Sequence, residues 1–128
     1  MNTGVVEIIT RTEGNTSRFR TERACVREEG GDYRVTYTQE GDAVSITANE
    51  RCLIMQRKGA ASLRMRFVRR EATSLILEEE GGGGEVPLYT AEYSFVRGKR
   101  GFSARLSYDL LFSASNQHFY VTIKSEEK

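Results

Sequence analysis

Short runs in which apolar and polar residues alternate recur along almost the whole chain. The clearest is residues 63–67, where Leu63, Met65 and Phe67 alternate with Arg64 and Arg66. Alternation with a period of two places the apolar side chains of a strand on one face and the polar ones on the other. No segment makes a convincing helix, so the chain is expected to consist of half-buried strands.

About ten such runs follow one another at a spacing of roughly 8–12 residues, with turn-forming residues between them. The expected strands cover residues 4–12, 19–28, 33–38, 44–48, 52–57, 63–67, 72–77, 86–96, 102–112 and 118–124. Short links between sequential strands favour an antiparallel meander, and closure of the sheet removes its exposed edges. The predicted fold is one all-β domain over residues 1–128, an antiparallel meander β-barrel of about 8–10 strands.

Two local predictions concern the second half of the chain. The acidic, glycine-rich residues 78–85 are expected to form a flexible loop, because no Lys-Ser/Thr pair follows to make a phosphate-binding loop. Within residues 86–96 one face is predicted to carry Tyr89, Ala91, Tyr93 and Phe95. The opposite face is predicted to carry Leu88, Thr90, Glu92 and Ser94.

The charges nearly balance, with 19 Lys and Arg against 18 Asp and Glu and a net charge of +1. This balance argues against a dedicated nucleic-acid or membrane-surface protein, although a basic patch can still exist locally. The N-terminus has no signal-peptide pattern, and no apolar run approaches the ~20 residues of a membrane span. A cytoplasmic location is therefore expected.

The spacing of the two cysteines, Cys25 and Cys52, matches no zinc or redox motif. Two buried free thiols are predicted, and a disulfide between neighbouring strands is the alternative.

Several segments carry a family resemblance. They are Asp32-Tyr33-Arg34-Val35-Thr36-Tyr37, Arg57-Lys58-Gly59 followed by Met65-Arg66-Phe67, Tyr89-Thr90-Ala91, and Leu106-Ser107-Tyr108-Asp109-Leu110. In these segments the chain resembles the YwiB-like proteins, a bacterial family of unknown function with a calycin-like, lipocalin-related β-barrel. The resemblance covers nearly the whole chain and is strongest over residues 32–124. It implies a barrel and no particular activity. The chain departs from the family pattern at residues 74–84, where a Tyr-x-Thr-x-Tyr-Gly-like segment is expected.

Catalytic signatures are weak. His118 is the sole histidine, and it lies at the start of an expected strand. The sequence shows no recognisable Ser-His-Asp arrangement. Because no general base or nucleophile is recognisable, an enzyme is less expected than a binding protein. The acidic residues near the glycine run are expected to be solvated. No metal site and no cofactor are predicted.

The predicted function is a non-enzymatic binding module. Arg57 ends an otherwise apolar strand, so its guanidinium is expected at the barrel mouth, where it could bind a carboxylate or phosphate bidentately. A salt bridge to an acidic residue of a neighbouring strand is the alternative.

The remaining candidate ligand-binding residues are Tyr33, Tyr37, Tyr108 and Thr90. Phe67 and Phe112 are expected to help fill the interior. The expected partner is a small ligand, with an anion favoured by Arg57, or another protein; the chain could be a monomer or a dimer.

A nucleic-acid-associated barrel is the second hypothesis. Arg18 and Arg20 could join Arg64 and Arg66 in a basic stripe interleaved with aromatic residues, as in single-strand binders. A salt-bridged outer face is the alternative for these arginines. A contiguous positive face would favour nucleic acid, and a roomy lumen would favour a small ligand.

Overall fold

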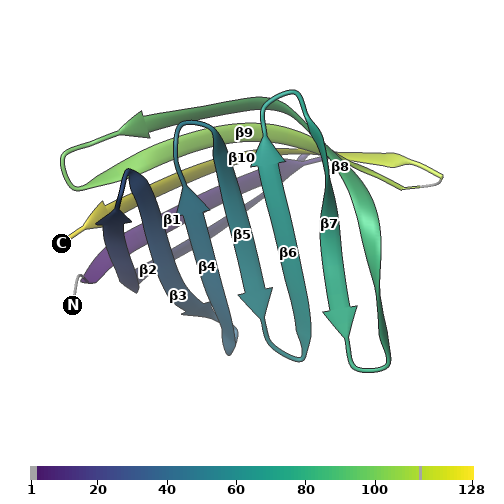
Figure 1. Ribbon diagram of the computed structural model, residues 1–128, viewed down its shortest axis with the longest axis horizontal. Coiled ribbons are helices and arrows are strands. Elements are labelled where there is room, and N and C mark those ends of the chain that lie inside the picture. The colour runs from purple at the N-terminus through teal and green to yellow at the C-terminus, as the bar shows by residue number, and fades with distance from the viewer. Residues whose placement is uncertain (1–2, 113) are drawn as a thin grey trace.

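The computed structural model describes residues 3–112 and 114–128, and these form ten strands and no helix (Figure 1). The strands are β1 (Thr3–Thr12), β2 (Asn15–Glu29), β3 (Asp32–Gln39), β4 (Asp42–Ala48), β5 (Cys52–Lys58), β6 (Ala61–Val68), β7 (Ala72–Glu79), β8 (Gly82–Arg97), β9 (Gly101–Leu111) and β10 (Asn116–Glu127). Each strand pairs antiparallel with the next, and β1 also pairs with β10, so the sheet closes into a barrel. The predicted all-β meander barrel is confirmed.

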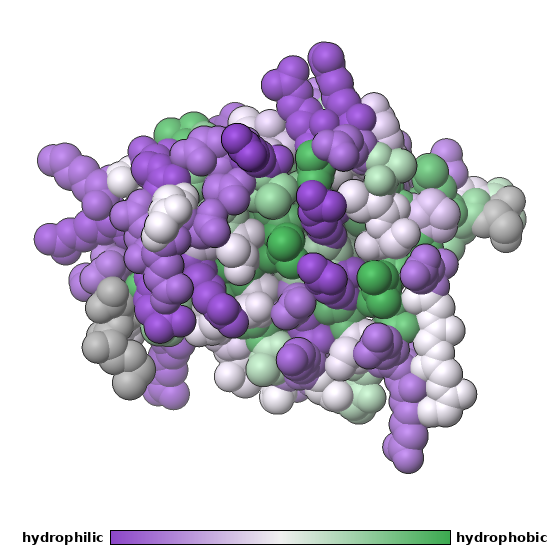
Figure 2. Space-filling model, in the orientation of Figure 1, coloured by the Kyte–Doolittle hydropathy of each residue, from purple (hydrophilic) through white to green (hydrophobic). Residues whose placement is uncertain are grey.

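The barrel is flattened into two walls. In Figure 1, β4 to β7 stand upright while β9, β10 and β1 run across them at a steep angle. Figure 2 shows hydrophilic side chains over most of the wall that faces the viewer, with hydrophobic patches between them. The two chain ends meet at one end of the barrel, where the Lys128 N–H donates to the Thr3 carbonyl oxygen at 2.9 Å.

Aromatic rings fill much of the interior. Phe67 on β6 packs against Tyr108 on β9 with a centroid distance of 4.7 Å, and two strands separate β6 from β9 in the sheet. Tyr33 on β3 packs against Phe102 on β9 at 5.3 Å. These contacts cross from wall to wall, so the barrel has a packed core of the kind that small barrels build from inward side chains.

The glycine run is strand rather than loop, so the predicted flexible loop is wrong. Only Glu80 and Gly81 form the turn, and Gly81 takes a φ of +91° that favours glycine. Gly82 to Gly84 pair with the end of β7. A Cβ on Gly83 would lie 2.4 Å from the Leu77 carbonyl oxygen, so the close approach of the two strands requires glycine at this position.

A β-bulge in β8 overturns the predicted faces of residues 86–96. The register against β9 shifts between Thr90 and Glu92, which inserts Ala91 as an extra residue. Leu88 and Thr90 therefore point inward together with Tyr93, and Tyr89 points outward. The β6–β7 turn docks at the bulge, where Arg70 N–H donates to the Thr90 carbonyl oxygen at 2.7 Å.

Phe112 was also expected inside, and this prediction is wrong. The side chain is 42% exposed, because β9 ends at Leu111 before the chain turns.

Cys25 and Cys52 are half-buried and free. They lie on β2 and β5, with β3 and β4 between them, so about three strand spacings of ~4.8 Å separate the strands that carry them. This exceeds the ~7 Å Cα separation that a disulfide tolerates, so the alternative of a bridge between neighbouring strands is wrong. Among the described residues, no helix has the length and apolar character needed to span a membrane.

We expect titration with a thiol reagent, after denaturation without reductant, to find both thiols of each chain. The separation of the two strands prevents an internal bridge. A count of zero, with monomers on a non-reducing gel, would contradict the strand placement.

Candidate functional site

Arg57 lies at one mouth of the barrel. It faces inward from β5 between Val44 and Leu63. Its Nε donates to Asp42 Oδ2 at 2.7 Å, and its Nη2 lies 3.7 Å from a carboxylate oxygen of Glu40. Arg57 therefore takes part in the salt bridge that the sequence left open as an alternative.

Gly59 in the β5–β6 turn leaves room for the Asp42 carboxylate of this ion pair. A Cβ on Gly59 would lie 1.9 Å from Asp42 Oδ1, so the carboxylate packs directly against the glycine. A pocket of about 200 Å³ lies beside Arg57, and its charged lining also includes Lys58, Arg64 and Glu78. The pocket is small, and the Arg57 guanidinium in its lining is already neutralised by Asp42.

We expect Arg57→Ala to lower the free energy of unfolding by about 1–2 kcal/mol, because Asp42 would lose its charged partner in a site that is largely shielded from water. The Arg57 and Asp42 side chains are 29% and 28% exposed. Urea denaturation of Arg57→Ala, Asp42→Ala and the double variant measures the coupling between them. Purely additive effects would show that the pair contributes nothing.

The three candidate tyrosines are buried, but they do not gather at the Arg57 mouth. Tyr37 lies near Arg57, whereas Tyr33 lies near the opposite end beside Arg97. Tyr108 stacks on Phe119 and packs at a tilt against Phe67. Burial raises the pKa of both Tyr37 and Tyr108 to about 12, with Arg57 partly offsetting the rise at Tyr37. Both phenols are therefore neutral at physiological pH.

Thr90 is fully buried at the bulge, away from either mouth. Its Oγ1 has no hydrogen-bond partner among the described residues. Its backbone anchors the β6–β7 turn, since Thr90 N–H donates to the Glu71 carbonyl oxygen at 3.3 Å. The position supports a structural role for Thr90.

We expect Thr90→Val to raise the free energy of unfolding by about 1 kcal/mol, because a methyl group would replace an unpaired buried hydroxyl of similar shape. The measurement is urea denaturation. Thr36→Val on the outer face of β3 is the matched control, with little change expected. A loss of stability in Thr90→Val would indicate a hidden partner for the hydroxyl.

Arg97 and Tyr93 close the other end of the barrel. The Arg97 guanidinium lies over the rings of Tyr33 and Phe95, 5.2 and 5.3 Å from their centroids, and pairs with Glu28 and with Glu50. The hydrogen bond from Arg97 lowers the pKa of Glu50 and raises that of Arg97. Sequence reasoning missed this cluster, although Arg97 continues the alternation of Tyr93 and Phe95.

Tyr93 ties β8 to the β4–β5 connection. Its hydroxyl lies 2.6 Å from the Asn49 carbonyl oxygen and 3.1 Å from that of Cys52. Burial raises the pKa of Tyr93, and the nearby Cys52 and Glu50 raise it further. The hydroxyl therefore stays protonated and can donate to these carbonyl groups.

A groove of about 970 Å³ lies on the outer face of β1, β8, β9 and β10. We call it the arginine groove; its lining includes Arg11, Arg69, Arg70, Glu92, Arg105, Ser107, Tyr120 and Thr122. The register places Arg11, Tyr120, Ser107 and Glu92 in one row across the four strands. The turn docked at the bulge contributes Arg69 and Arg70. Among the described residues of the lining, Glu92 is the only carboxylate.

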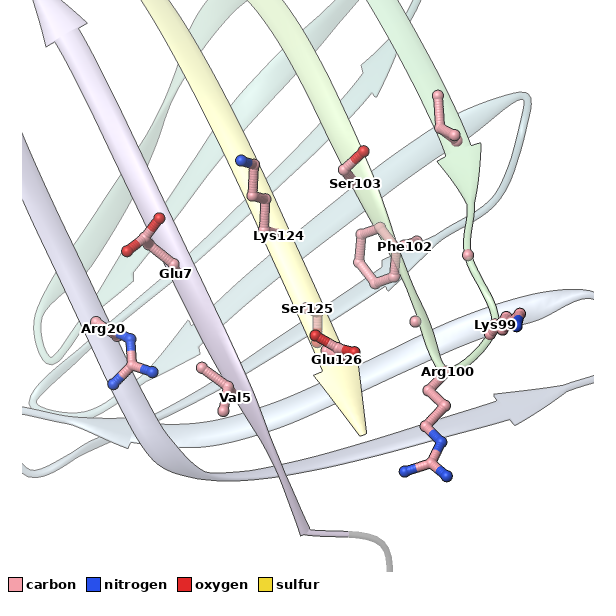
Figure 3. A pocket seen from close by; sticks show the side chains of 13 residues that line it. Val5, Glu7, Arg20, Lys99, Arg100, Phe102, Ser103, Lys124, Ser125 and Glu126 are labelled. Atoms are coloured by element: carbon pink, nitrogen blue, oxygen red, sulfur yellow. The ribbon is translucent and has the colours of Figure 1, made fainter. Parts of the chain in front are cut away.

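A second groove of about 530 Å³ adjoins the first near the chain ends, and we call it the terminal groove (Figure 3). Its charged residues are Glu7, Arg20, Lys99, Arg100, Lys124 and Glu126. Lys124 and Ser103 are the next outward positions after Thr122 and Arg105 on the same strands. We call the two grooves together the basic face.

The basic face has a strong charge excess. It combines eight cationic side chains with three carboxylates, a net charge of +5, against +1 for the whole chain. Among the described residues, Arg20 alone of these eight forms an ion pair, with Glu22 at 3.8 Å. The other seven cationic groups remain available to an external anion.

The structure does not bring the four arginines of the predicted stripe together. Arg18 and Arg20 lie on β2, opposite Ile9 and Glu7 at the border of the basic face. Arg64 and Arg66 lie on β6, and three strands intervene. The row from Arg64 toward β2 holds the uncharged residues Gln56, Ser45 and Thr36.

His118 lies on the outer face of β10, 41% exposed, where its Nδ1 pairs with an oxygen of Asp109 on β9. Its ring meets that of Tyr120 edge-on at 4.5 Å. Within the described part of the chain, no group of three or more His, Cys, Asp or Glu side chains is placed to hold a metal ion.

Comparison with known proteins identifies the family. The fold matches the crystal structure of the ywiB protein from Bacillus subtilis with a TM-score of 0.81 over 99% of this chain and 93% of that chain. The identity is 18%, so the match establishes the fold alone. No curated protein matches the sequence. Residues 4–122 match the domain of unknown function DUF1934. The chain therefore belongs to the DUF1934 family, a β-barrel family of unknown function, in agreement with its YwiB-like sequence features.

Proposed function

We propose that this barrel is a non-enzymatic binding module for an anionic ligand, and that the ligand occupies the basic face rather than the barrel mouth. The observation that carries the proposal is the net charge of +5 on the basic face, with seven of its eight cationic groups outside any ion pair among the described residues. Guanidinium groups bind phosphate and carboxylate groups bidentately, and such pairs are stronger than neutral hydrogen bonds.

The barrel mouths are less suited to an anion. At one mouth Arg57 is neutralised by Asp42 and faces Glu40, and at the other Arg97 is shared by Glu28 and Glu50. An anion at either mouth would have to displace a carboxylate. The tyrosines between the mouths are packed core residues with little exposed surface.

The test is isothermal titration calorimetry with sodium tripolyphosphate at low salt. We expect binding that weakens as salt is added, because exposed charges are screened. The double variant Arg11→Gln, Arg105→Gln should lose most of the binding, whereas the matched outer-face control Arg64→Gln, Arg66→Gln should keep it. Absence of binding would overturn the proposal. Equal losses in both variants, or loss in Arg57→Ala alone, would overturn the assignment to the basic face.

A further inference from the structure

The exposed apolar side chains share a wall with the unpaired cations. Among the described residues, the large hydrophobic side chains classed as exposed are Tyr89, Val96, Leu111, Phe112 and Tyr120. All of them lie on β8, on β10, or at the end of β9, and none lies on β2 to β7. Val96 lines the terminal groove and Tyr120 lines the arginine groove, whereas Tyr89, Leu111 and Phe112 lie outside both linings. An exposed aromatic ring within a cationic groove favours a ligand with both anionic and apolar parts.

Tyr120 is the exposed aromatic ring of the arginine groove. It is 56% exposed and lies in the arginine groove between Arg11 on β1 and Ser107 on β9. Its ring is held edge-on by His118, which in turn pairs with Asp109. An exposed aromatic ring that is fixed in orientation offers a flat platform for stacking.

Tyr89 supplies a second ring on the same wall. It is 37% exposed and pairs with Asp109 across β8 and β9, so it lies in the row of His118, one row away from Tyr120. Arg105 lies one outward position along β9 from Ser107, on the other side of the Tyr120 row. Tyr89 and Tyr120 therefore lie in two neighbouring rows, Arg11 shares the row of Tyr120, and Arg105 lies in the row after it.

From this arrangement we infer that the basic face binds single-stranded nucleic acid, with Tyr120 stacking on a base and the surrounding arginines contacting phosphates. The inference rests on the proposed function and names the ligand class. Stacking of bases on aromatic rings within a positively charged groove is how single-strand binders hold nucleic acid without reading its sequence. The platform needs an unpaired base, because the faces of paired bases are already stacked in a duplex.

The size of the face also favours a polymer over a small anion. Arg11, Arg105 and Lys124 lie in three successive rows, from the Tyr120 row to the Lys124 row of β10. Four residues of strand span about 13 Å at ~3.3 Å per residue. Lys99 and Arg100 add cations in the terminal groove, and cations in successive rows suit a chain of phosphates.

Fluorescence anisotropy tests the inference. The probes are a labelled oligo(dT) of about 12 nucleotides, within the footprint of single-strand binders, and an abasic oligomer of the same length and charge. We expect oligo(dT) to bind about tenfold more tightly than the abasic oligomer. Tyr120→Ala should abolish this difference, and Tyr120→Phe, which keeps the ring, should retain it. Phe112→Ala, an exposed aromatic outside both grooves, should change nothing.

Loss of the arginines should change the affinity and its salt dependence in a way that loss of Tyr120 does not. In Arg11→Gln, Arg105→Gln both oligomers should bind more weakly, and the slope of log affinity against log salt should fall by roughly 1.4, about 0.7 for each lost phosphate contact. Equal affinity for the two oligomers, tighter binding of a duplex of the same length, or binding unchanged in Tyr120→Ala would overturn the inference. If tripolyphosphate binds and neither oligomer does, the inference fails and the proposed function stands. If tripolyphosphate does not bind either, both fail.

Discussion

Phe67→Ala is expected to lower the free energy of unfolding by about 3–5 kcal/mol. Phe67 is 2% exposed, and its ring packs against Tyr108 from the opposite wall. Truncation would remove the buried ring and leave a cavity that the closed sheet cannot collapse to fill. Urea denaturation followed by circular dichroism measures the effect.

Phe112→Ala is the matched control for Phe67→Ala. Phe112 is 42% exposed, and its truncation should change stability by less than ~0.5 kcal/mol. If the two variants lost similar stability, the interior would be loosely packed and the contact between Phe67 and Tyr108 would not be a core contact.

Gly101→Ala should be the most damaging single-methyl change, with a loss of roughly 3 kcal/mol, the upper end of the range for overpacking. A Cβ at this position would lie 1.9 Å from the Ser125 carbonyl oxygen and 2.8 Å from the Glu126 Cα. Both atoms belong to the backbone of β10, so relief requires the strands to move apart.

Gly84→Ala provides the matched control for Gly101→Ala. A Cβ on Gly84 meets no atom within 4 Å. This substitution should leave stability unchanged or raise it slightly, because alanine restricts the unfolded chain. Thermal unfolding of both variants distinguishes the two cases, and equal melting temperatures would contradict the close approach of β9 and β10.

The fold was predictable because each strand carries its own signal. Alternation such as Tyr33, Val35 and Tyr37 needs only local sequence, and all ten expected strands are present, several of them longer than predicted. The bulge at Ala91 was not predictable, because it depends on a turn twenty residues away that docks against Thr90. The glycines of β8 were predicted as a loop because a glycine-rich composition disfavours a strand. Pairing with β7 nevertheless holds these residues in a strand.

The candidate sites were less predictable than the strands. Arg57 pairs with Asp42 on the neighbouring strand β4, and neighbouring strands could be predicted from the meander. The ion pair could therefore be anticipated as an alternative. The basic face could not be anticipated from the sequence. It joins residues as distant as Arg11 and Arg105 through the register of three strands. Neither residue stands out in the sequence, and the near-zero net charge conceals an uneven distribution.

Closure of the sheet has a consequence for folding. Every pairing except one joins strands that are adjacent in the chain, and the exception, β1 with β10, joins the two ends. Hairpins of adjacent strands can form early, because closing their short loops costs little entropy. The pairing of β1 with β10 must instead bring together segments more than a hundred residues apart. Until it closes, β1 and β10 are both open edges that can pair with another chain. At high concentration, refolding should therefore yield domain-swapped dimers in which β1 of one chain completes the barrel of the other.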